Sequence, residues 1–324
     1  MMSCLFCYLL LIVILFIDKM VDLSASLSGV KFGNPTVLPA GILGVAASSL
    51  ARIASAGAGA VTTKSVGPER REGHKNPVVV AVDNGLLNAV GLSCPGLDES
   101  VEELKKAVRA AHVPVIASFY GRTVEEFGLV AERISAAKPA FIEANISCPN
   151  IEDEYGKPFG TSCELAARVV AVVKDMSRVP LIVKLTPNVS DIKNIALSVE
   201  EAGADCIAAV NTVGPGMYID VLSAKPVLSN RAGGLSGPAI RPIAVRCVYD
   251  IYEAVDIPII GMGGISSGRD AAEMLLAGAS AVGIGTAVWT RGDGVFKEVC
   301  AELGKIMEER GDRSLKDLIG KAHC

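Results

Sequence analysis

One segment of the sequence, Phe141 to Asn150, places reactive and hydrogen-bonding side chains directly after an apolar run. The run FIEAN is typical of a buried strand, and ISCPN follows it as a polar turn stiffened by a proline. Polar turns after buried strands are common positions for site residues. Cys148 has a side-chain pKa of the order that acid–base work needs, so we interpret it as a candidate base. The alternative is a small, buried apolar residue.

Lysines and asparagines at neighbouring candidate positions favour a flat, anionic heterocycle as the ligand. Lys64 and Lys184 end predicted strands, where a cation can stabilise negative charge on a ring or a product. Four asparagines offer amide donors and acceptors, with loop capping as the alternative use of each: Asn88, Asn145, Asn150 and Asn211. The histidines fall outside the predicted site, in a loop, at a helix end and in the tail: His74, His112 and His323.

Two glycine-rich motifs near the end of the chain predict a phosphate site. GMGGIS contains Gly263 and Gly264, and GIGTAV contains Gly285 and Thr286. Without a Cβ atom, such residues let backbone N–H groups approach an anion closely. Glycines also serve tight turns, so neither motif is specific alone, but the last two strands of a barrel are a recurrent phosphate position.

The elements that must position these residues alternate between apolar strands and amphipathic helices. Eight strands are predicted near residues 36–40, 60–63, 113–117, 141–144, 181–183, 206–210, 257–262 and 281–284. Helices are predicted near residues 49–56, 101–111, 124–137, 164–176, 191–202, 240–254, 268–277 and 296–310. Strands that are apolar throughout and separated by helices indicate an α/β fold with a covered parallel sheet.

Eight such units predict a closed (β/α)8 barrel in one domain. A repeated AGA pattern supports it, because Gly57, Gly203 and Gly278 each stand where a helix must end before the next strand. Long connections, roughly 64–100 and 211–239, follow strands 2 and 6 and are expected to form the site. The residues after the strands should then converge on one face: Ala40, Gly41, Lys64, Ser65, Ser118, Asn145, Cys148, Lys184, Thr186, Asn211, Thr212, Gly263, Gly264, Gly285 and Thr286.

Composition favours a globular enzyme that acts on small molecules. The chain has 324 residues and a formal net charge of -4, with acidic and basic residues interspersed, so nucleic acid is not an expected partner. Nine scattered cysteines are typical of a reduced, cytoplasmic protein. Cys4 and Cys7 have CxxC spacing but no second pair to complete a zinc site, and no metal is expected.

The first 19 residues form an apolar extension that differs from the rest of the chain, and residues 20–324 form the predicted barrel domain. The apolar run is shorter than the roughly 20 residues of a membrane span, and it lacks the basic start and cleavage site of a signal peptide. We interpret it as a start codon assigned too far upstream, with a weak membrane anchor as the alternative.

Several motifs together resemble class 1 dihydroorotate dehydrogenases, flavin enzymes of pyrimidine (UMP) synthesis, over about residues 27–320. They are NISCPN, NAVGLSCPG, VKLTPNV, NTVGPGM, GGLSGPAI and GMGGISSGRDAAEMLLAGASAVGIGTA. Cysteine at position 148 fits class 1, since class 2 enzymes carry serine there. FGT in the segment after Asn150, without a VPGKPQ-like run, is more similar to the class 1B catalytic subunit of archaeal type.

The resemblance implies that Cys148 takes a proton from C5 of dihydroorotate while a hydride leaves C6 for N5 of FMN. It implies that the substrate is bound by Lys64, Asn88, Ala89, Val90, Gly91, Leu92, Asn145, Asn211 and Thr212. Lys184 would balance charge beside the flavin ring. The implied FMN site comprises Ala40, Gly41, Lys64, Ser65, Ser118, Asn145, Lys184, Val210, Gly237, Gly263, Gly264, Gly285 and Thr286.

Three positions depart from the commonest family pattern, namely Ala40 for serine, Cys94 for asparagine and Ser118 for asparagine. The contact of Ser118 with FMN is therefore in doubt. The resemblance also implies a homodimer joined to a separate subunit that carries FAD and an iron–sulfur cluster and reduces NAD. This sequence has neither a cysteine cluster of iron–sulfur spacing nor a GxGxxG motif between a strand and a helix.

Three other functions fit parts of the pattern. Another FMN barrel, a dihydropyrimidine or dihydrouridine reductase, would prefer a ring without a carboxylate, or a nucleotide or RNA. A flavin-free barrel isomerase or synthase would use the phosphate site for a sugar phosphate, and its purified form would be colourless. A non-catalytic scaffold is disfavoured by the polar residues that converge on one face.

Overall fold

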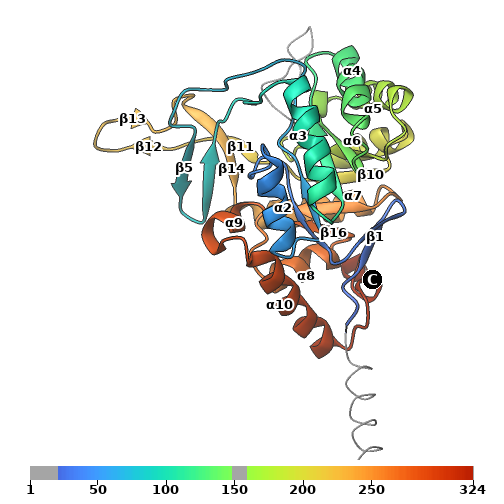
Figure 1. Ribbon diagram of the computed structural model, residues 1–324. Coiled ribbons are helices and arrows are strands. Elements are labelled where there is room, and N and C mark those ends of the chain that lie inside the picture. The colour runs from blue at the N-terminus through green and yellow to red at the C-terminus, as the bar shows by residue number, and fades with distance from the viewer. Residues whose placement is uncertain (1–20, 148–158, 324) are drawn as a thin grey trace, which may run out of the picture.

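A closed barrel of eight parallel strands forms the centre of the computed structural model, which describes residues 21–147 and 159–323 (Figure 1). The barrel strands are β3 (Thr36–Leu38), β4 (Ala60–Thr62), β7 (Val115–Phe119), β8 (Phe141–Asn145), β9 (Leu181–Lys184), β10 (Cys206–Ala209), β15 (Ile259–Met262) and β16 (Ala281–Gly283). They follow one another in chain order around the barrel, and β16 closes it against β3. All eight predicted strands are confirmed, with ends that differ by a few residues.

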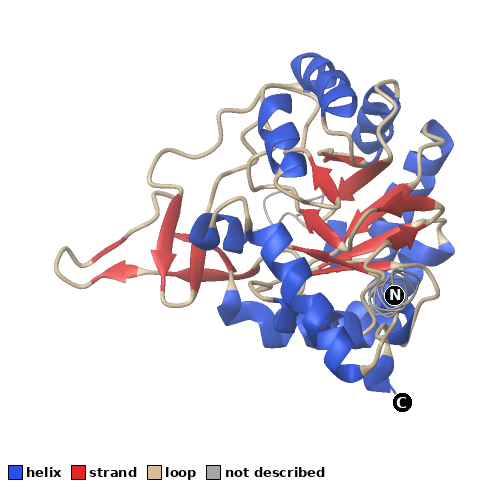
Figure 2. Ribbon diagram, turned by 60° about the horizontal axis from the view of Figure 1, so that its bottom comes forward, coloured by secondary structure: helices blue, strands red, loops and turns tan. Residues whose placement is uncertain are grey.

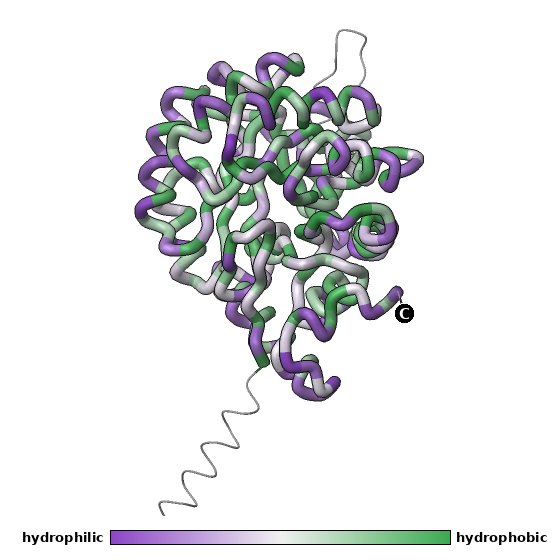
Figure 3. Tube along the Cα trace, turned by 90° about the vertical axis from the view of Figure 1, so that its right-hand side faces the viewer, coloured by the Kyte–Doolittle hydropathy of each residue, from purple (hydrophilic) through white to green (hydrophobic). Residues whose placement is uncertain are grey.

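The barrel strands are mostly apolar because both of their faces are covered, and the polar residues that they contain, such as Glu143, Asn145 and Lys184, are buried as well. Every residue of β8, β9 and β10 is buried, and Phe141 and Ile142 have no exposed surface. Phe141 packs edge-on against Phe32, with ring centroids 6.3 Å apart. A tube coloured by hydropathy shows hydrophobic segments inside and mixed, alternating segments outside (Figure 3). The burial of apolar surface on both faces of the sheet stabilises the barrel.

Helices surround the barrel on the outside (Figure 2). They are α2 (Ala47–Ser55), α3 (Leu97–Ala110), α4 (Val124–Ser135), α5 (Cys163–Met176), α6 (Ile192–Glu201), α7 (Arg241–Tyr252), α8 (Gly268–Leu276), α9 (Thr286–Arg291) and α10 (Val295–Arg310). The glycines predicted to end three of them do so with positive φ, at 111° for Gly57, 103° for Gly203 and 114° for Gly278. The helices predicted from the sequence are thereby confirmed, whereas the short helix α9 was not expected.

The two long connections pair with each other in a second, antiparallel sheet. It comprises β5 (Val79–Val82) and β6 (Gly85–Asn88) from the connection after β4, and β11 (Val213–Met217) and β14 (Ala232–Ser236) from the connection after β10. Its order is β11-β14-β6-β5, with Gly234 opposite Asn88. A small hairpin, β12 (Ile219–Asp220) and β13 (Lys225–Pro226), projects from it (Figure 1). The prediction that these connections form elements of their own is confirmed.

Smaller elements complete the part of the chain that is described. The hairpin β1 (Ala25–Leu27) and β2 (Val30–Phe32) precedes the barrel. Short helical turns are η1 (Phe159–Thr161), η2 (Pro238–Ile240), η3 (Leu315–Asp317) and η4 (Lys321–His323). Within residues 21–147 and 159–323, no helix is both long and apolar enough to cross a membrane. The apolar extension of the first 19 residues lies outside the described residues.

Candidate active site

A cavity of about 1190 Å³ lies at the carboxyl ends of the barrel strands, next to the antiparallel sheet. Its volume exceeds the usual range of roughly 300–1,000 Å³ for the site of one small ligand. The cavity therefore has room for two ligands together, such as a cofactor and a substrate. Of the predicted site residues, it is lined by Ala40, Gly41, Lys64, Ser65, Asn88, Ala89, Val90, Gly91, Leu92, Asn145, Lys184, Val210, Asn211, Thr212, Gly237, Gly263, Gly264, Gly285 and Thr286.

One side of this cavity, which we call the polar wall, carries Asn145, Lys184 and Asn211 from the ends of β8, β9 and β10. A run of hydrogen bonds fixes the amides. The Ser147 hydroxyl donates to Asn145 Oδ1 at 2.6 Å, and Asn211 Nδ2 donates to the same hydroxyl oxygen at 2.6 Å. Asn145 Nδ2 donates to Ser65 Oγ at 3.3 Å. Each asparagine is thus oriented before a ligand arrives.

Lys184 is the notable charge of the polar wall. It is only 4% exposed, and the strand register places it beside Asn145. None of the ion pairs found within residues 21–147 and 159–323 includes Lys184. Because a buried charge is normally paired, this lysine favours an anionic or electron-rich group in the cavity.

Ser118 lies beneath the cavity and does not line it. It has no exposed surface, and its hydroxyl donates to Glu143 Oε1 at 2.8 Å. The hydroxyls of Ser118 and Ser65 lie 2.9 Å apart. Ser118 therefore contacts Ser65, which lines the cavity, but does not line it itself. Its predicted contact with FMN stays a prediction. Its visible role is to provide a donor for the buried carboxylate of Glu143.

Another part of the cavity lining, the glycine wall, is formed by Gly237, Gly263, Gly264 and Gly285. Gly263 and Gly264 have φ angles of 135° and 78°, which side-chain-bearing residues rarely adopt. A Cβ on Gly264 would lie 2.8 Å from the carbonyl oxygen of Gly237. The first N–H groups of α9, which begins at Thr286, have no partner within their own helix. This wall offers backbone donors and little side-chain bulk.

Cys148, the predicted base, lies outside the described residues, as do Pro149 and Asn150. Three of the described cysteines, Cys206, Cys247 and Cys300, are poor bases. Burial raises the pKa of Cys247 and of Cys300 to about 11, and burial together with the nearby Glu143 charge raises the pKa of Cys206. Among residues 21–147 and 159–323, no cluster of histidine, cysteine and acidic side chains is arranged to hold a metal ion.

Sequence reasoning missed three kinds of cavity-lining residue. Asn188 lies within the VKLTPNV motif and donates from Nδ2 to the Thr212 carbonyl at 3.2 Å. Ser236 bonds the Thr286 hydroxyl at 2.9 Å. Trp289 lines the cavity and is 72% exposed. The motifs VKLTPNV around Asn188 and GGLSGPAI around Ser236 were usable signals, whereas Trp289 follows from tertiary structure alone.

The barrel and its cavity define a (β/α)8-barrel enzyme with its site at the carboxyl ends of the strands. Residues 22–307 match the protein family described as dihydroorotate dehydrogenase. This chain belongs to the dihydroorotate dehydrogenase family.

Individual relatives agree with this assignment. The chain is 48% identical over 299 residues to the dihydroorotate dehydrogenase B (NAD(+)) catalytic subunit of Methanosarcina acetivorans, covering 92% of this chain and 95% of the relative. It is 48% identical over 301 residues to the protein of the same name from Methanothermobacter thermautotrophicus, covering 93% and 98%. The corresponding Methanocaldococcus jannaschii protein is 46% identical over 304 residues, again covering 93% and 98%.

A solved structure has the same fold. The crystal structure of DHODH from Eimeria tenella in complex with ferulenol superposes with a TM-score of 0.81, covering 93% of this chain and 89% of that one. Sequence identity with it is 23%, so the likeness concerns the fold.

Proposed function

We propose that this chain oxidises dihydroorotate to orotate in pyrimidine biosynthesis, using FMN bound in the cavity. The observation that carries the proposal is the joining of the polar wall and the glycine wall in one cavity large enough for two ligands. Relatives that share 46–48% of the sequence over more than nine-tenths of the chain are named dihydroorotate dehydrogenases. The rival functions require a different ligand in the same space.

The residues present fit FMN. The glycine wall presents backbone to the cavity, because the packing and the φ angles at Gly263 and Gly264 exclude side chains there, and backbone N–H groups can bind a phosphate. Lys184 supplies a buried cation that suits an electron-rich ring system. When bound, FMN supplies the hydride acceptor. Lys184 would stabilise negative charge on that ring system, and Gly264 and Thr286 would hold the phosphate.

Removal of the substrate proton is assigned to Cys148. A thiolate is a stronger base near neutral pH than a serine hydroxyl, and the position directly follows Ser147, which is hydrogen-bonded to Asn145 and Asn211. The two asparagines would hold the amide and carbonyl groups of the dihydroorotate ring. The loop Asn88–Leu92 would close the remaining side of the substrate.

A partner subunit is proposed as the route for electrons to NAD. The relatives carry the words catalytic subunit and NAD(+) in their names. We propose a homodimer of this chain joined to an electron-transfer subunit with FAD and an iron–sulfur cluster, in a heterotetramer located in the cytoplasm. The isolated, FMN-loaded chain should then reduce almost no NAD, and adding the partner should restore NAD reduction. Brisk turnover with fumarate and no gain from any partner would contradict the complex.

The substrate assignment is tested by comparing dihydroorotate with dihydrouracil, which has the same ring without the carboxylate. Formation of the oxidised ring, orotate or uracil respectively, is followed by its ultraviolet absorbance with an artificial dye as electron acceptor. The proposal predicts turnover with dihydroorotate and negligible turnover with dihydrouracil. Preference for dihydrouracil, or for a dihydrouridine-containing RNA, would support the rival flavin reductases instead.

A further inference from the structure

Four successive backbone carbonyls of the loop Ala89–Leu92 accept hydrogen bonds from groups outside that loop. His74 holds the first two. Its Nδ1 lies 3.0 Å from the carbonyl oxygen of Ala89, and its backbone N–H donates to the carbonyl of Val90 at 3.1 Å. Because a carbonyl oxygen only accepts, this contact requires the proton on Nδ1 of the imidazole.

Two further side chains hold the other carbonyls. Arg71 Nε donates to the carbonyl of Gly91 at 2.8 Å. The Tyr120 hydroxyl donates to the carbonyl of Leu92 at 3.4 Å. We call Arg71, His74 and Tyr120 the carbonyl clamp. Arg71 and His74 belong to the connection after β4, and Tyr120 directly follows β7. Two separate segments therefore bind the same loop.

The loop Ala89–Leu92 has an unfavourable backbone conformation. Gly91 has a φ angle of 76°, and the next residue, Leu92, has a φ angle of 56°. A leucine in this left-handed region is uncommon and unfavourable without compensation. The bond from Tyr120 falls on the carbonyl of this leucine, which is also buried. The clamp therefore stabilises a loop conformation that the sequence alone disfavours.

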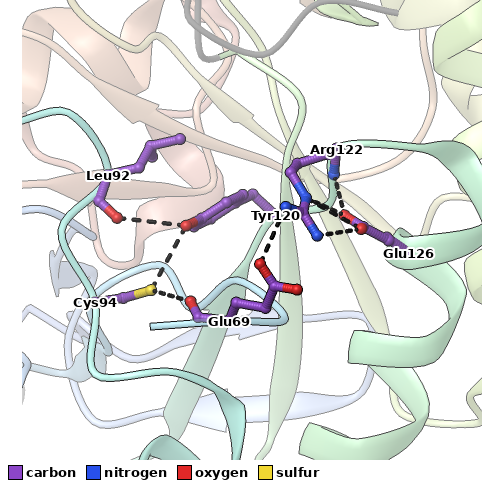
Figure 4. Close-up of polar contacts among 6 residues, drawn as sticks. All are labelled: Glu69, Leu92, Cys94, Tyr120, Arg122 and Glu126. Atoms are coloured by element: carbon purple, nitrogen blue, oxygen red, sulfur yellow. Dashed lines mark hydrogen bonds and ion pairs between the residues drawn. The ribbon is translucent and has the colours of Figure 1, made fainter. Parts of the chain in front are cut away.

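Tyr120 is itself in contact with neighbouring groups (Figure 4). Its ring covers Gly67, where an added Cβ would lie 2.3 Å from the ring. The Cys94 thiol lies 3.5 Å from the Tyr120 hydroxyl and donates to the carbonyl of Glu69 at 3.4 Å. The Glu69 carboxylate pairs with Arg122 at 3.1 Å. The support thus extends from the loop to the start of α4.

Every residue of Ala89–Leu92 lines the cavity, while the groups of the carbonyl clamp contact the loop carbonyls. We propose that Arg71, His74 and Tyr120 are positioning residues that set the affinity of the cavity for the substrate, and for its product, by fixing this loop. The inference rests on the proposed function, since it concerns the same substrate. The clamp affects binding of the ring more than the chemical step.

The test uses Tyr120→Phe and Arg71→Gln in the full-length, FMN-loaded protein. Each variant removes one hydrogen bond to a loop carbonyl, and Tyr120→Phe also removes the contact with Cys94, so we expect the KM for dihydroorotate to rise about fivefold. The Kd for orotate, measured from the change in the visible flavin spectrum, should rise by a similar factor. The rate of flavin reduction at saturating dihydroorotate should stay within about twofold of the original.

The matched control is Arg70→Gln. Arg70 precedes Arg71, is largely exposed and pairs with Glu72 at 3.0 Å, away from the loop carbonyls. It should leave both KM and Kd unchanged. If Tyr120→Phe does not fold, Arg71→Gln decides the question alone.

Unchanged KM and Kd in the clamp variants, in a protein that dihydroorotate reduces normally, would overturn the clamp and leave the proposed function intact. A fall in the saturated rate without a change in KM would also overturn it. Failure of the unsubstituted protein to be reduced by dihydroorotate would instead overturn the proposed function.

Discussion

The polar wall and the glycine wall face the same cavity but are built on opposite principles. The polar wall presents functional groups, and hydrogen bonds with Ser147 and Ser65 hold its asparagines in place. The glycine wall presents backbone and empty space, because Gly263 and Gly264 have φ angles that suit glycine. The polar wall can select a ligand by its hydrogen-bonding groups and charge. The glycine wall can admit a ligand group close to the backbone, because no side chain obstructs it.

This difference predicts that substitutions on the two walls fail differently. Changes at the polar wall should reduce catalysis or substrate binding while FMN stays bound. Changes at the glycine wall should release FMN, and activity would be lost only as a consequence. The following experiments measure flavin content and flavin reduction separately, so that the two kinds of failure can be distinguished.

The largest effect is expected from the substitution Cys148→Ser. In the sequence, Cys148 lies three residues after Asn145, the polar-wall residue at the end of β8. Exchanging a thiolate for a much weaker hydroxyl base should slow flavin reduction by dihydroorotate about 10²–10⁴-fold near neutral pH. Flavin content should stay the same. Stopped-flow absorbance measures the rate, and a rate within about threefold of the original would show that Cys148 is not the base.

Gly264→Ala should have the next largest effect, on FMN binding. The new Cβ would lie 2.8 Å from the Gly237 carbonyl, on a backbone with a φ angle of 78°. Strain of about 1–3 kcal/mol corresponds to roughly a 5- to 150-fold loss of FMN affinity. The control is Gly304→Ala in α10, where a Cβ meets nothing within 4 Å. Equal flavin retention by both variants after dialysis would contradict the glycine wall.

Ser118→Ala tests whether Ser118 belongs to the polar wall or only lies beneath it. The change removes the donor to Glu143 and the contact with Ser65, and leaves a buried carboxylate poorly satisfied. We expect a loss of about 1–3 kcal/mol in unfolding free energy, seen as a Tm lowered by several degrees, with FMN content unchanged. The control is Ser198→Ala, because the Ser198 hydroxyl donates to the Ile195 carbonyl within the same helix, α6. A variant of normal Tm that has lost FMN would show direct contact between Ser118 and the cofactor.

The smallest effect concerns a helix cap that belongs to neither wall. The Glu103 carboxylate accepts from the Ala47 backbone N–H at the start of α2 and pairs with Lys106, and both contacts lower its pKa below the ordinary 4.5. A lowered folded-state pKa means that the stabilisation is present above pH 4.5 and is lost as the pH falls through the folded-state value. Glu103→Gln should therefore lower the Tm at pH 7 by no more than about 2 °C, with a smaller difference near pH 3. A larger difference at low pH would contradict this account.

The barrel was predictable because its signals are local. Strands such as β9 and β10 are short apolar runs that become buried on both faces, and Gly203 marks the helix end between them. In a (β/α)8 barrel, residues at the carboxyl ends of the strands meet at one face. Asn145 and Lys184 could therefore be placed together once the strand order was known. Most of the candidate site was therefore predictable as well.

The antiparallel sheet and the carbonyl clamp were not predictable in the same way. β11 and β14 have the sequences VGPGM and AGGLS, in which glycine and proline conceal the strand signal. β14 pairs with β6 and so joins residues far apart in the chain, such as Gly234 and Asn88. His74 was predicted to lie in a loop outside the site, and only the tertiary structure brings it against the carbonyl of Ala89.

The most direct test of the two-wall account is an anaerobic titration of the FMN-loaded chain with dihydroorotate, followed at the visible absorption band of the flavin. The account predicts a coloured protein with one FMN per chain, whose absorption bleaches as an equal amount of orotate appears. A colourless protein that takes up no FMN on reconstitution would contradict the glycine wall. A bound flavin that dihydroorotate leaves oxidised would contradict the polar wall as the substrate site.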